Sequence, residues 1–393
     1  MHSRIPYSRQ TIDDADIAAV ADCLRSDFLT QGPQTRAFEE AAAAYIGCAH
    51  AIAVSNGTAA LHLVCQGLGL GPGGLLWTSP NSFVASANAG RYLGADVDFV
   101  DIDTQTGSID PAALETKLAK ASANGRKPDI LIAVHFAGHS FGFDRVAALC
   151  AEHGVLLVED AAHAFGAVYE DDPQRKVGNH PLSAATTFSF HPLKSITTGE
   201  GGMIVTRSDA LARDLGMLRS HGITKDPAMM THARQDDGDW YYEQHLLGFN
   251  YRICDIQAAL GVSQMQKIDA LMEARRFQAR RYAELLADLP LSLPLATDCS
   301  SWHLYVVRLD PARTQVSRRA LFDRLRSERI EAHVHYIPIH TQPYYRELGF
   351  APGDFPQSEY YYDYCLSLPI YPLMSDEDQD RVVACLKDAL LHA

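Results

Sequence analysis

The chain has 393 residues, of which 47 % are hydrophobic, so it can form one large domain and a second, smaller one. Its 34 basic and 48 acidic residues leave a formal charge of −14, which argues against a surface for nucleic acid or anionic membrane. Any phosphate-bearing ligand must therefore be held by local groups.

The eight cysteines are scattered without a C-x-x-C pair, as is usual in a reducing compartment. Residues 1–16 have no apolar core of signal-peptide type, and no uninterrupted apolar run reaches the length that spans a bilayer. We therefore expect a cytoplasmic protein that binds neither nucleic acid nor membrane.

Helical stretches alternate with short apolar runs from about residue 35 to residue 210. The apolar runs are "AIAVS" (51–55), "LLWTSP" (75–80), "VDFVDI" (97–102), "ILIAVHF" (130–136) and "VLLVED" (155–160). Buried parallel strands have this pattern, which predicts an α/β fold with a mostly parallel sheet flanked by helices. Chemistry is then expected at the ends of the strands.

The segment "VSNGTAALHL" (54–63) predicts a strand end, a tight turn at Asn56 and Gly57, and a helix that begins near Thr58 and Ala59. The free N–H groups at such a helix start can bind an anion, although many similar turns bind nothing. The next glycine-rich segment, "GLGPGG" (69–74), matches the dinucleotide fingerprint formally. Because it follows a helix and precedes a strand, we predict a loop there.

Asp160 ends the apolar run 155–160, where a buried carboxylate is unfavourable unless it has a partner. Its alternative role is to cap a following helix. Lys194 follows in "FHPLKSITTGEGG" (190–202), between two strand-like stretches. A helix start for a phosphate, a carboxylate for a pyridinium nitrogen and an amine for an aldehyde are what pyridoxal 5'-phosphate (PLP) requires, so we predict this cofactor.

Residues 255–289 predict one long helical stretch, and strand-like and helical segments return after it at 303–309, 317–330, 331–338 and 378–391. We therefore divide the chain into a large domain, 1–270, and a smaller C-terminal α+β domain, 271–393. Three histidines in "HVHYIPIH", at 333, 335 and 340, raise the possibility of zinc. Surface or substrate-contacting histidines explain the pattern as well, so we predict no metal.

An ordered set of motifs resembles the DegT/DnrJ/EryC1/StrS family of PLP-dependent sugar aminotransferases of fold type I. The resemblance covers almost the whole chain and rests on "LTQGPQTRAFEEAAAAYIG" (29–47), "SNGTAALHL" (55–63), "SPNSFVASANA" (79–89), "VEDAAHAFGA" (158–167), "FSFHPLKSITTGEGG" (188–202), "LRSHGI" (218–223), "GFNYRICDIQAALGVSQ" (248–264) and "HVHYIPIHTQPYY" (333–345). It implies a large PLP-binding domain and a smaller C-terminal domain.

The resemblance implies a role for each matched residue around the cofactor ring. Lys194 bonds the cofactor covalently and shuttles the proton, Asp160 pairs with the pyridine nitrogen, and His163 contacts the phenolic oxygen. Phe83 stacks on the ring, unless it is a core residue.

For the phosphate, the resemblance implies Thr58 and Ala59 at the helix start and the hydroxyl of Ser189, unless that hydroxyl is only satisfied within its strand. Asn250 reaches the phosphate of the neighbouring subunit, which implies a homodimer with shared sites.

The implied reaction moves an amino group from L-glutamate to the C4 ketone of a nucleotide-linked 4-keto-6-deoxy sugar. Several motifs most resemble family members of pseudaminic acid biosynthesis, which convert UDP-2-acetamido-2,6-dideoxy-L-arabino-hex-4-ulose into UDP-4-amino-4,6-dideoxy-N-acetyl-beta-L-altrosamine. Another UDP- or dTDP-4-keto sugar, an amino-acid aminotransferase and a non-catalytic binding protein remain alternatives. A lysine at position 194 favours transamination over dehydration, because dehydratases of the group carry histidine there.

Arg219, His335 and Tyr336 are candidate contacts for the sugar nucleotide, and their alternative is a place on the surface. Residues 225–248 predict a polar, mobile loop near the site. Its possible anchors are Trp240, Tyr241 and Tyr242.

Overall fold

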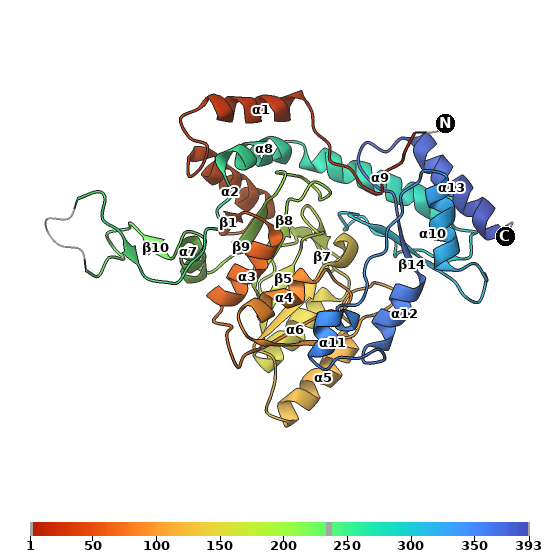
Figure 1. Cartoon of the computed structure of the whole chain (residues 1–393), viewed down its shortest axis with the longest axis horizontal. Coiled ribbons are helices and arrows are strands. Elements are labelled where there is room, and N and C mark those ends of the chain that lie inside the picture. Colours follow the sequence, from red (N-terminus) through yellow and green to blue (C-terminus); the bar gives the residue numbers. More distant parts are fainter. Residues whose placement is uncertain (1–2, 233–237, 392–393) are drawn as a thin grey trace.

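The computed structural model describes residues 3–232 and 238–391 (Figure 1). At its centre is a seven-stranded sheet in the order β1-β9-β8-β5-β4-β2-β3. Its strands are β1 (His50–Val54), β2 (Leu75–Thr78), β3 (Asp96–Phe99), β4 (Ile130–Val134), β5 (Leu156–Asp160), β8 (Ser183–Ser189) and β9 (Gly202–Thr206). Only β9 runs antiparallel to its neighbours, which confirms the predicted mostly parallel sheet.

Both faces of this sheet are covered, which explains the continuous apolar runs. Leu131 and Leu157 lie in one hydrophobic core, whereas their neighbours Ile132 and Val158 lie in a second core on the opposite face. A strand alternates its side chains between faces, so strands covered by helices on both sides must be apolar at every position.

The helices of this α/β layer lie before, between and after the strands in the chain, and two of them precede β1. They are α1 (Asp14–Arg25), α2 (Pro33–Ile46), α3 (Gly57–Gly67), α4 (Ala85–Tyr92), α5 (Pro111–Ala123), α6 (Phe143–His153), α7 (Asp209–Leu218) and α8 (Asp255–Met265). The segment 69–74 is a turn between α3 and β2, so the predicted loop is confirmed there. Short pairs complete the layer, β6 (Val168–Tyr169) with β7 (Asp172–Lys176), and β10 (Ile223–Thr224) with β11 (Glu243–Gln244).

The C-terminal part has its own core around a three-stranded antiparallel sheet. Its elements are α9 (Ile268–Leu285), β12 (Leu291–Ser292), β13 (Tyr305–Leu309), α10 (Arg318–Ser327), α11 (Pro343–Glu347), α12 (Pro356–Tyr364), β14 (Cys365–Leu368) and α13 (Asp376–Leu391). Met272 packs in the core of the large sheet and Ala279 in the C-terminal core, so the change of core falls within α9.

The N-terminal segment packs with the C-terminal part, although the predicted division of the chain places it in the large domain, 1–270. Ile5 was grouped with residues 1–270, but it packs in the C-terminal core and its N–H bonds the carbonyl of Arg329 at 3.0 Å. Figure 1 shows this segment running beside the C-terminal helices. A boundary near residue 270 stays a prediction, whereas the first residues belong with the second core.

Two predicted elements are wrong. The long helix expected over 255–289 is interrupted at Lys267, which leaves helical geometry. The ammonium of Lys267 pairs with Asp13 at 2.6 Å and Asp16 at 2.5 Å. The strand expected over 331–338 does not form, and His333 makes only an isolated bridge to Ser367.

The pair β10 and β11 projects away from the body of the molecule (Figure 1). Residues 233–237, within the predicted loop 225–248, lie outside the described residues. Of the proposed anchors, Trp240 and Tyr242 are exposed to 75 % and 52 %, and Tyr241 donates its hydroxyl to Glu243 at 3.2 Å. The role of this segment stays a prediction.

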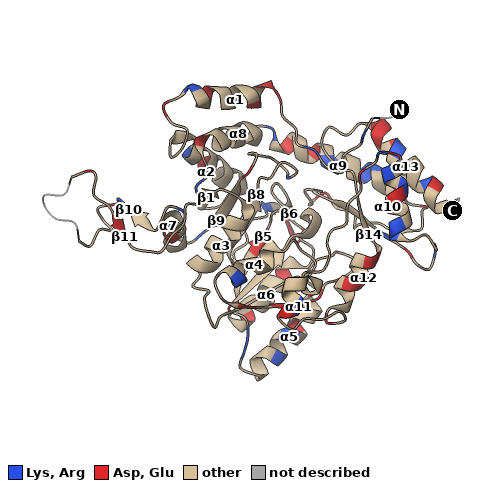
Figure 2. Cartoon of the chain, viewed as in Figure 1, with Lys and Arg blue, Asp and Glu red and all other residues tan. Residues whose placement is uncertain are grey.

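Basic and acidic side chains are interspersed on the surface helices, and α10 and α13 carry both signs (Figure 2). Arg324 of α10, for example, bonds Glu328 just after that helix at 2.6 Å and Asp388 of α13 at 3.1 Å. All eight cysteines are free thiols. In the described parts of the chain, no helix combines the length and the apolar character needed to cross a membrane.

Candidate active site

A cavity of about 920 Å³ opens at the carboxyl ends of β1, β5 and β8. Its wall includes residues 56–59 after β1, three residues at the end of β5 (Asp160, Ala162 and His163), and four at and after the end of β8 (Ser189, His191, Leu193 and Lys194). Tyr7 of the N-terminal segment and residues 333–337 of the C-terminal part close another side of the cavity. The strand ends that the sequence indicated therefore do converge, as is general for open α/β sheets.

Asp160 is buried in this wall, and two neutral groups orient its carboxylate. The hydroxyl of Ser86 donates to Oδ2 at 2.6 Å, and the N–H of Ala162 donates to Oδ1 at 3.2 Å. Residues 161–167 form turns, so the alternative that Asp160 caps a helix is wrong. Its carboxylate is thus fixed at the cavity and available to a cationic ligand group.

Lys194 lies in the same cavity, in the connection between β8 and β9. Among the residues that the structure describes, no hydrogen bond or ion pair to its amine is found. Desolvation lowers the pKa of Lys194 from 10.5 to about 8, against the opposing attraction of the Asp160 charge. An amine with this pKa is partly neutral near pH 7 and can act as a nucleophile and base.

His163 completes this group and faces Tyr336. Its Nε2 lies 3.1 Å from the Tyr336 hydroxyl, whereas its Nδ1 is buried without a partner. Burial, and then the charge of Lys194, lower the pKa of His163 well below its usual value. The imidazole is therefore neutral, with one nitrogen free for a ligand atom.

The turn after β1 forms the phosphate-type end of the cavity. The Asn56 side chain caps α3 and accepts the N–H of Ala59 at 2.8 Å. Thr58 and Ala59 are the two residues predicted to meet a phosphate at this helix start. The N–H of Ala59 already donates to the cap, so of the two only the N–H of Thr58 is left free of it. A side chain on Gly57 would place a Cβ 3.0 Å from that of Ser189, so glycine lets the helix start approach the end of β8.

Phe83 is 60 % exposed and lines the cavity, with its ring centroid 6.5 Å from that of Tyr336. The alternative that Phe83 belongs to the core is therefore wrong. An exposed aromatic face beside Asp160 and Lys194 is suited to stacking against a flat ring.

The structure separates the predicted substrate contacts. His335 and Tyr336 line the cavity, and the Nδ1 of His335 lies 2.7 Å from the Ser367 hydroxyl. Burial lowers the pKa of His335 to about 3, so this ring is neutral. Arg219 does not line the cavity; its guanidinium bonds the carboxylate of Glu39, and it also donates to the carbonyl of Ala53 at 2.6 Å.

Asn250 is exposed and does not line the cavity of its own chain. Its backbone forms an isolated bridge with Ser220, close to the foot of the projecting pair β10 and β11. The predicted contact of Asn250 with a phosphate is therefore not made in the cavity of its own chain, and its role in a neighbouring subunit stays a prediction.

The three histidines considered for zinc do not converge. His333 and His335 stack with ring centroids 4.8 Å apart, but the Nε2 of His340 bonds Glu359 at 2.9 Å. Within residues 3–232 and 238–391, no group of three or more His, Cys, Asp or Glu side chains is placed to hold a metal ion.

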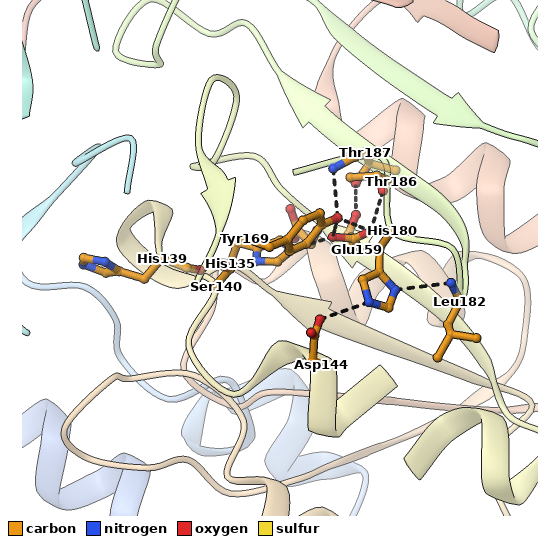
Figure 3. Close-up of polar contacts among 12 residues, drawn as sticks. His135, His139, Ser140, Asp144, Glu159, Tyr169, His180, Leu182, Thr186 and Thr187 are labelled. Carbon is orange, nitrogen blue, oxygen red and sulfur yellow. Dashed lines mark hydrogen bonds and ion pairs between the residues drawn. The ribbon is translucent and has the colours of Figure 1, made fainter. Parts of the chain in front are cut away.

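The sequence did not indicate a buried network around Glu159, the neighbour of Asp160 in the chain (Figure 3). Glu159 is fully buried, and its carboxylate receives the Tyr169 hydroxyl at 2.8 Å and the Thr186 hydroxyl at 2.8 Å and lies 2.6 Å from the Nε2 of His135. These partners tie the ends of β4, β5 and β8 together. Strand alternation was the available signal, because it directs Glu159 to the face opposite Asp160.

Two further contacts were also missed. Ser86 lies inside the quoted motif 79–89, and its contact with Asp160 joins α4 to β5. His303 precedes β13 in sequence yet lines the cavity. Nothing in the local sequence around either residue indicates these long-range contacts.

Comparisons with known proteins agree with this geometry. Residues 10–387 match the family described as the DegT/DnrJ/EryC1/StrS aminotransferase family. The chain is 38 % identical to the spore coat polysaccharide biosynthesis protein SpsC of Bacillus subtilis (strain 168), over 99 % of this chain and 98 % of SpsC.

Two solved structures are similar over nearly their whole lengths. Helicobacter pylori PseC, an aminotransferase involved in the biosynthesis of pseudoaminic acid, has a TM-score of 0.89 and 30 % identity, with 100 % of each chain covered. The PLP form of the putative sugar aminotransferase Spr1654 from Streptococcus pneumoniae has a TM-score of 0.88 and 26 % identity, with 98 % of each chain covered.

Proposed function

We propose a substrate and residue roles for this chain, which belongs to the DegT/DnrJ/EryC1/StrS aminotransferase family and is a PLP-dependent sugar aminotransferase. The proposed reaction moves the amino group of L-glutamate to C4 of UDP-2-acetamido-2,6-dideoxy-L-arabino-hex-4-ulose. The product is UDP-4-amino-4,6-dideoxy-N-acetyl-beta-L-altrosamine. The observation that carries this substrate is the similarity to PseC over the full length of both chains.

The residues of the cavity fit PLP. The amine of Lys194 and the oriented carboxylate of Asp160 lie in one cavity, and among the described residues neither that amine nor the buried Nδ1 of His163 has a hydrogen-bond partner. Thr58 and Ser189 line the end formed by the start of α3, where the positive helix terminus favours a phosphate. When bound, PLP supplies an electron sink for the charge left on the substrate carbon after a proton departs.

Each side chain then has a defined task. The neutral amine of Lys194 takes the proton from the substrate carbon onto its Nζ and later gives that proton back. Asp160, held by Ser86, keeps a proton on the pyridine nitrogen. Tyr336 orients His163, whose imidazole bonds the phenolic oxygen without adding a positive charge beside Lys194.

We place Asn250 in the site of a second subunit, so the functional unit is a homodimer. The support is that Asn250 is exposed and does not line its own cavity. The nearby side chains of Trp240 and Leu247 are 75 % and 80 % exposed, as expected of apolar groups that a partner covers.

The substrate is tested by a product screen. Purified enzyme with L-glutamate is offered UDP- and dTDP-linked 4-keto-6-deoxy sugars, and the amine at C4 is assigned by NMR. We expect the UDP-L-arabino-hexulose to react fastest and to give an axial amine. A preference for a dTDP sugar, or for an equatorial amine, would refute the proposed substrate.

A further inference from the structure

His303 is fixed in the cavity wall by contacts between distant parts of the chain. The backbone N–H of His303 donates to the carbonyl of Ala137 at 3.0 Å, and the Ser301 hydroxyl donates to the carbonyl of His163 at 2.5 Å. Gly138 has a φ of +98°, and a Cβ there would collide with the Ser301 hydroxyl. The fold therefore requires this close approach, which brings the ring centroid of His303 to 4.4 Å from that of His163.

The imidazole of His303 has no partner in the part of the chain that is described. It is 4 % exposed, its Nδ1 is buried without a hydrogen bond, and no bond to either ring nitrogen is found. Two other cavity residues have such a buried nitrogen, but His62 bonds Tyr251 at 3.2 Å and His163 bonds Tyr336 through the other nitrogen. Buried polar groups are normally paired, so the imidazole of His303 in the cavity wall is a candidate partner for a ligand.

The position beside His163 limits which ligand group this can be. On the pyridoxal ring, the phenolic oxygen assigned to His163 is attached next to the carbon that carries the aldehyde. The α-carboxylate of an amino-acid donor is one bond from the carbon whose amine reacts there. With His163 bonded to the phenolic oxygen, His303, which packs against His163, would lie near the place that this carboxylate takes.

Of its described residues, the cavity offers a carboxylate no cationic side chain other than Lys194. Among the described residues that line it there is no arginine, and Lys194, its single lysine, is needed for the proton transfer. Burial, and then the charge of Lys194, lower the pKa of His303 well below its usual value. The ring is therefore a neutral donor of one N–H, which suits a carboxylate close to a catalytic amine.

We propose that His303 binds the α-carboxylate of the amino donor, and of the 2-oxo acid formed from it, through one imidazole N–H. This inference rests on the proposed function, because it requires L-glutamate in this cavity. It adds a substrate-binding residue and leaves the sugar half of the reaction to other groups.

The test measures 2-oxoglutarate binding to the PLP-loaded enzyme by calorimetry, because this acid has no amino group and cannot react with that form. His303→Phe keeps a ring but removes both nitrogens, and it should weaken binding by about 10- to 100-fold, as for one hydrogen bond to a charged group. His303→Gln keeps a donor and should retain most of the affinity. The control is His153→Phe, which replaces a histidine at the end of α6 that does not line the cavity and should bind like the wild type.

Three readouts separate the possible results. Equal affinity of the wild type and His303→Phe for 2-oxoglutarate overturns the role of His303 alone. If His303→Phe binds PLP more weakly but, once loaded with PLP, binds 2-oxoglutarate as the wild type does, the proposed role is also overturned and His303 is a cofactor contact. A wild type that binds no 2-oxoglutarate overturns the proposed donor and this inference with it. If His303→Phe does not fold, His303→Asn, whose shorter amide cannot reach as far, should bind more weakly than His303→Gln.

Discussion

At the scale of single residues, the site depends on two charged side chains, Asp160 and Lys194, that form no ion pair with another described residue. Asp160 is oriented by the Ser86 hydroxyl and a backbone N–H, and the Lys194 amine has no protein partner in the described chain. Groups arranged in this way are poised to meet charges that a ligand brings.

Removing the Ser86 hydroxyl should therefore weaken the cofactor complex. Ser86→Ala deletes a charge-assisted hydrogen bond of 2.6 Å to Asp160, and such bonds contribute about 1.5–3 kcal/mol. We expect PLP to bind about tenfold more weakly or worse, measured by absorbance titration of the apoprotein. Ser108→Ala is the control, because that buried hydroxyl has no partner and does not line the cavity. Identical PLP affinities of the two variants would contradict the role of Ser86.

The lowered pKa of Lys194 predicts how the apoprotein responds to pH. The neutral fraction of an amine with a pKa of about 8 rises about fivefold between pH 7 and pH 8. The rate of PLP uptake should rise through this range and level off above pH 9, as followed by stopped-flow absorbance. A rate that still rises steeply above pH 10 would show an ordinary lysine.

The same shift affects stability with a definite sign. The unfolded lysine keeps the ordinary pKa of 10.5, so between about pH 8 and 10.5 the unfolded chain binds more protons than the folded one. The contribution of Lys194 to the free energy of unfolding of the apoprotein therefore becomes more favourable as pH rises through this window.

At the scale of elements, the start of α3 and the end of β8 define the phosphate end of the cavity. Gly57→Ala should separate them, because the new Cβ would lie 3.0 Å from that of Ser189. We expect weaker PLP binding with little loss of secondary structure, measured by absorbance titration and circular dichroism. Gly216→Ala in α7 is the matched control. No atom lies within 4 Å of its new Cβ, so it should bind PLP normally and raise stability by about 0.5–1 kcal/mol.

Equal PLP affinity of the Gly57→Ala variant and the Gly216→Ala control would mean that the close approach of α3 to β8 is not needed for the phosphate.

The strands and the site at their ends were predictable because burial on both faces leaves a local signature. The run 155–160 is apolar until its last two residues, so Asp160 stands out, and Lys194 stands out beside a glycine-rich turn. Other features depend on distant partners and were missed. Lys267, where the long helix is interrupted, pairs with the distant Asp13 and Asp16, and His303 is held beside the distant Ala137 and Gly138.

At the scale of the whole molecule, the proposed homodimer makes each cavity depend on two chains. Lys194→Ala and Asn250→Ala should each reduce activity. The first damages the cavity of its own chain, and the second damages the cavity of the partner chain. When the two variants are unfolded together and refolded, mixed dimers contain one site with both Lys194 and Asn250. We expect activity to return in the mixture, with each variant refolded alone as the control. A mixture no more active than its parts would place Asn250 outside the partner's site.

The most direct test of the central claim is the visible absorption spectrum of the PLP-loaded enzyme before and after addition of L-glutamate. The structure predicts that the band of the lysine-bound cofactor disappears while 2-oxoglutarate is formed, and that Lys194→Ala folds but shows no turnover. A bound chromophore that does not respond to L-glutamate, or an active and normally coloured Lys194→Ala enzyme, would contradict the assignment of Lys194 as the residue that carries the transamination.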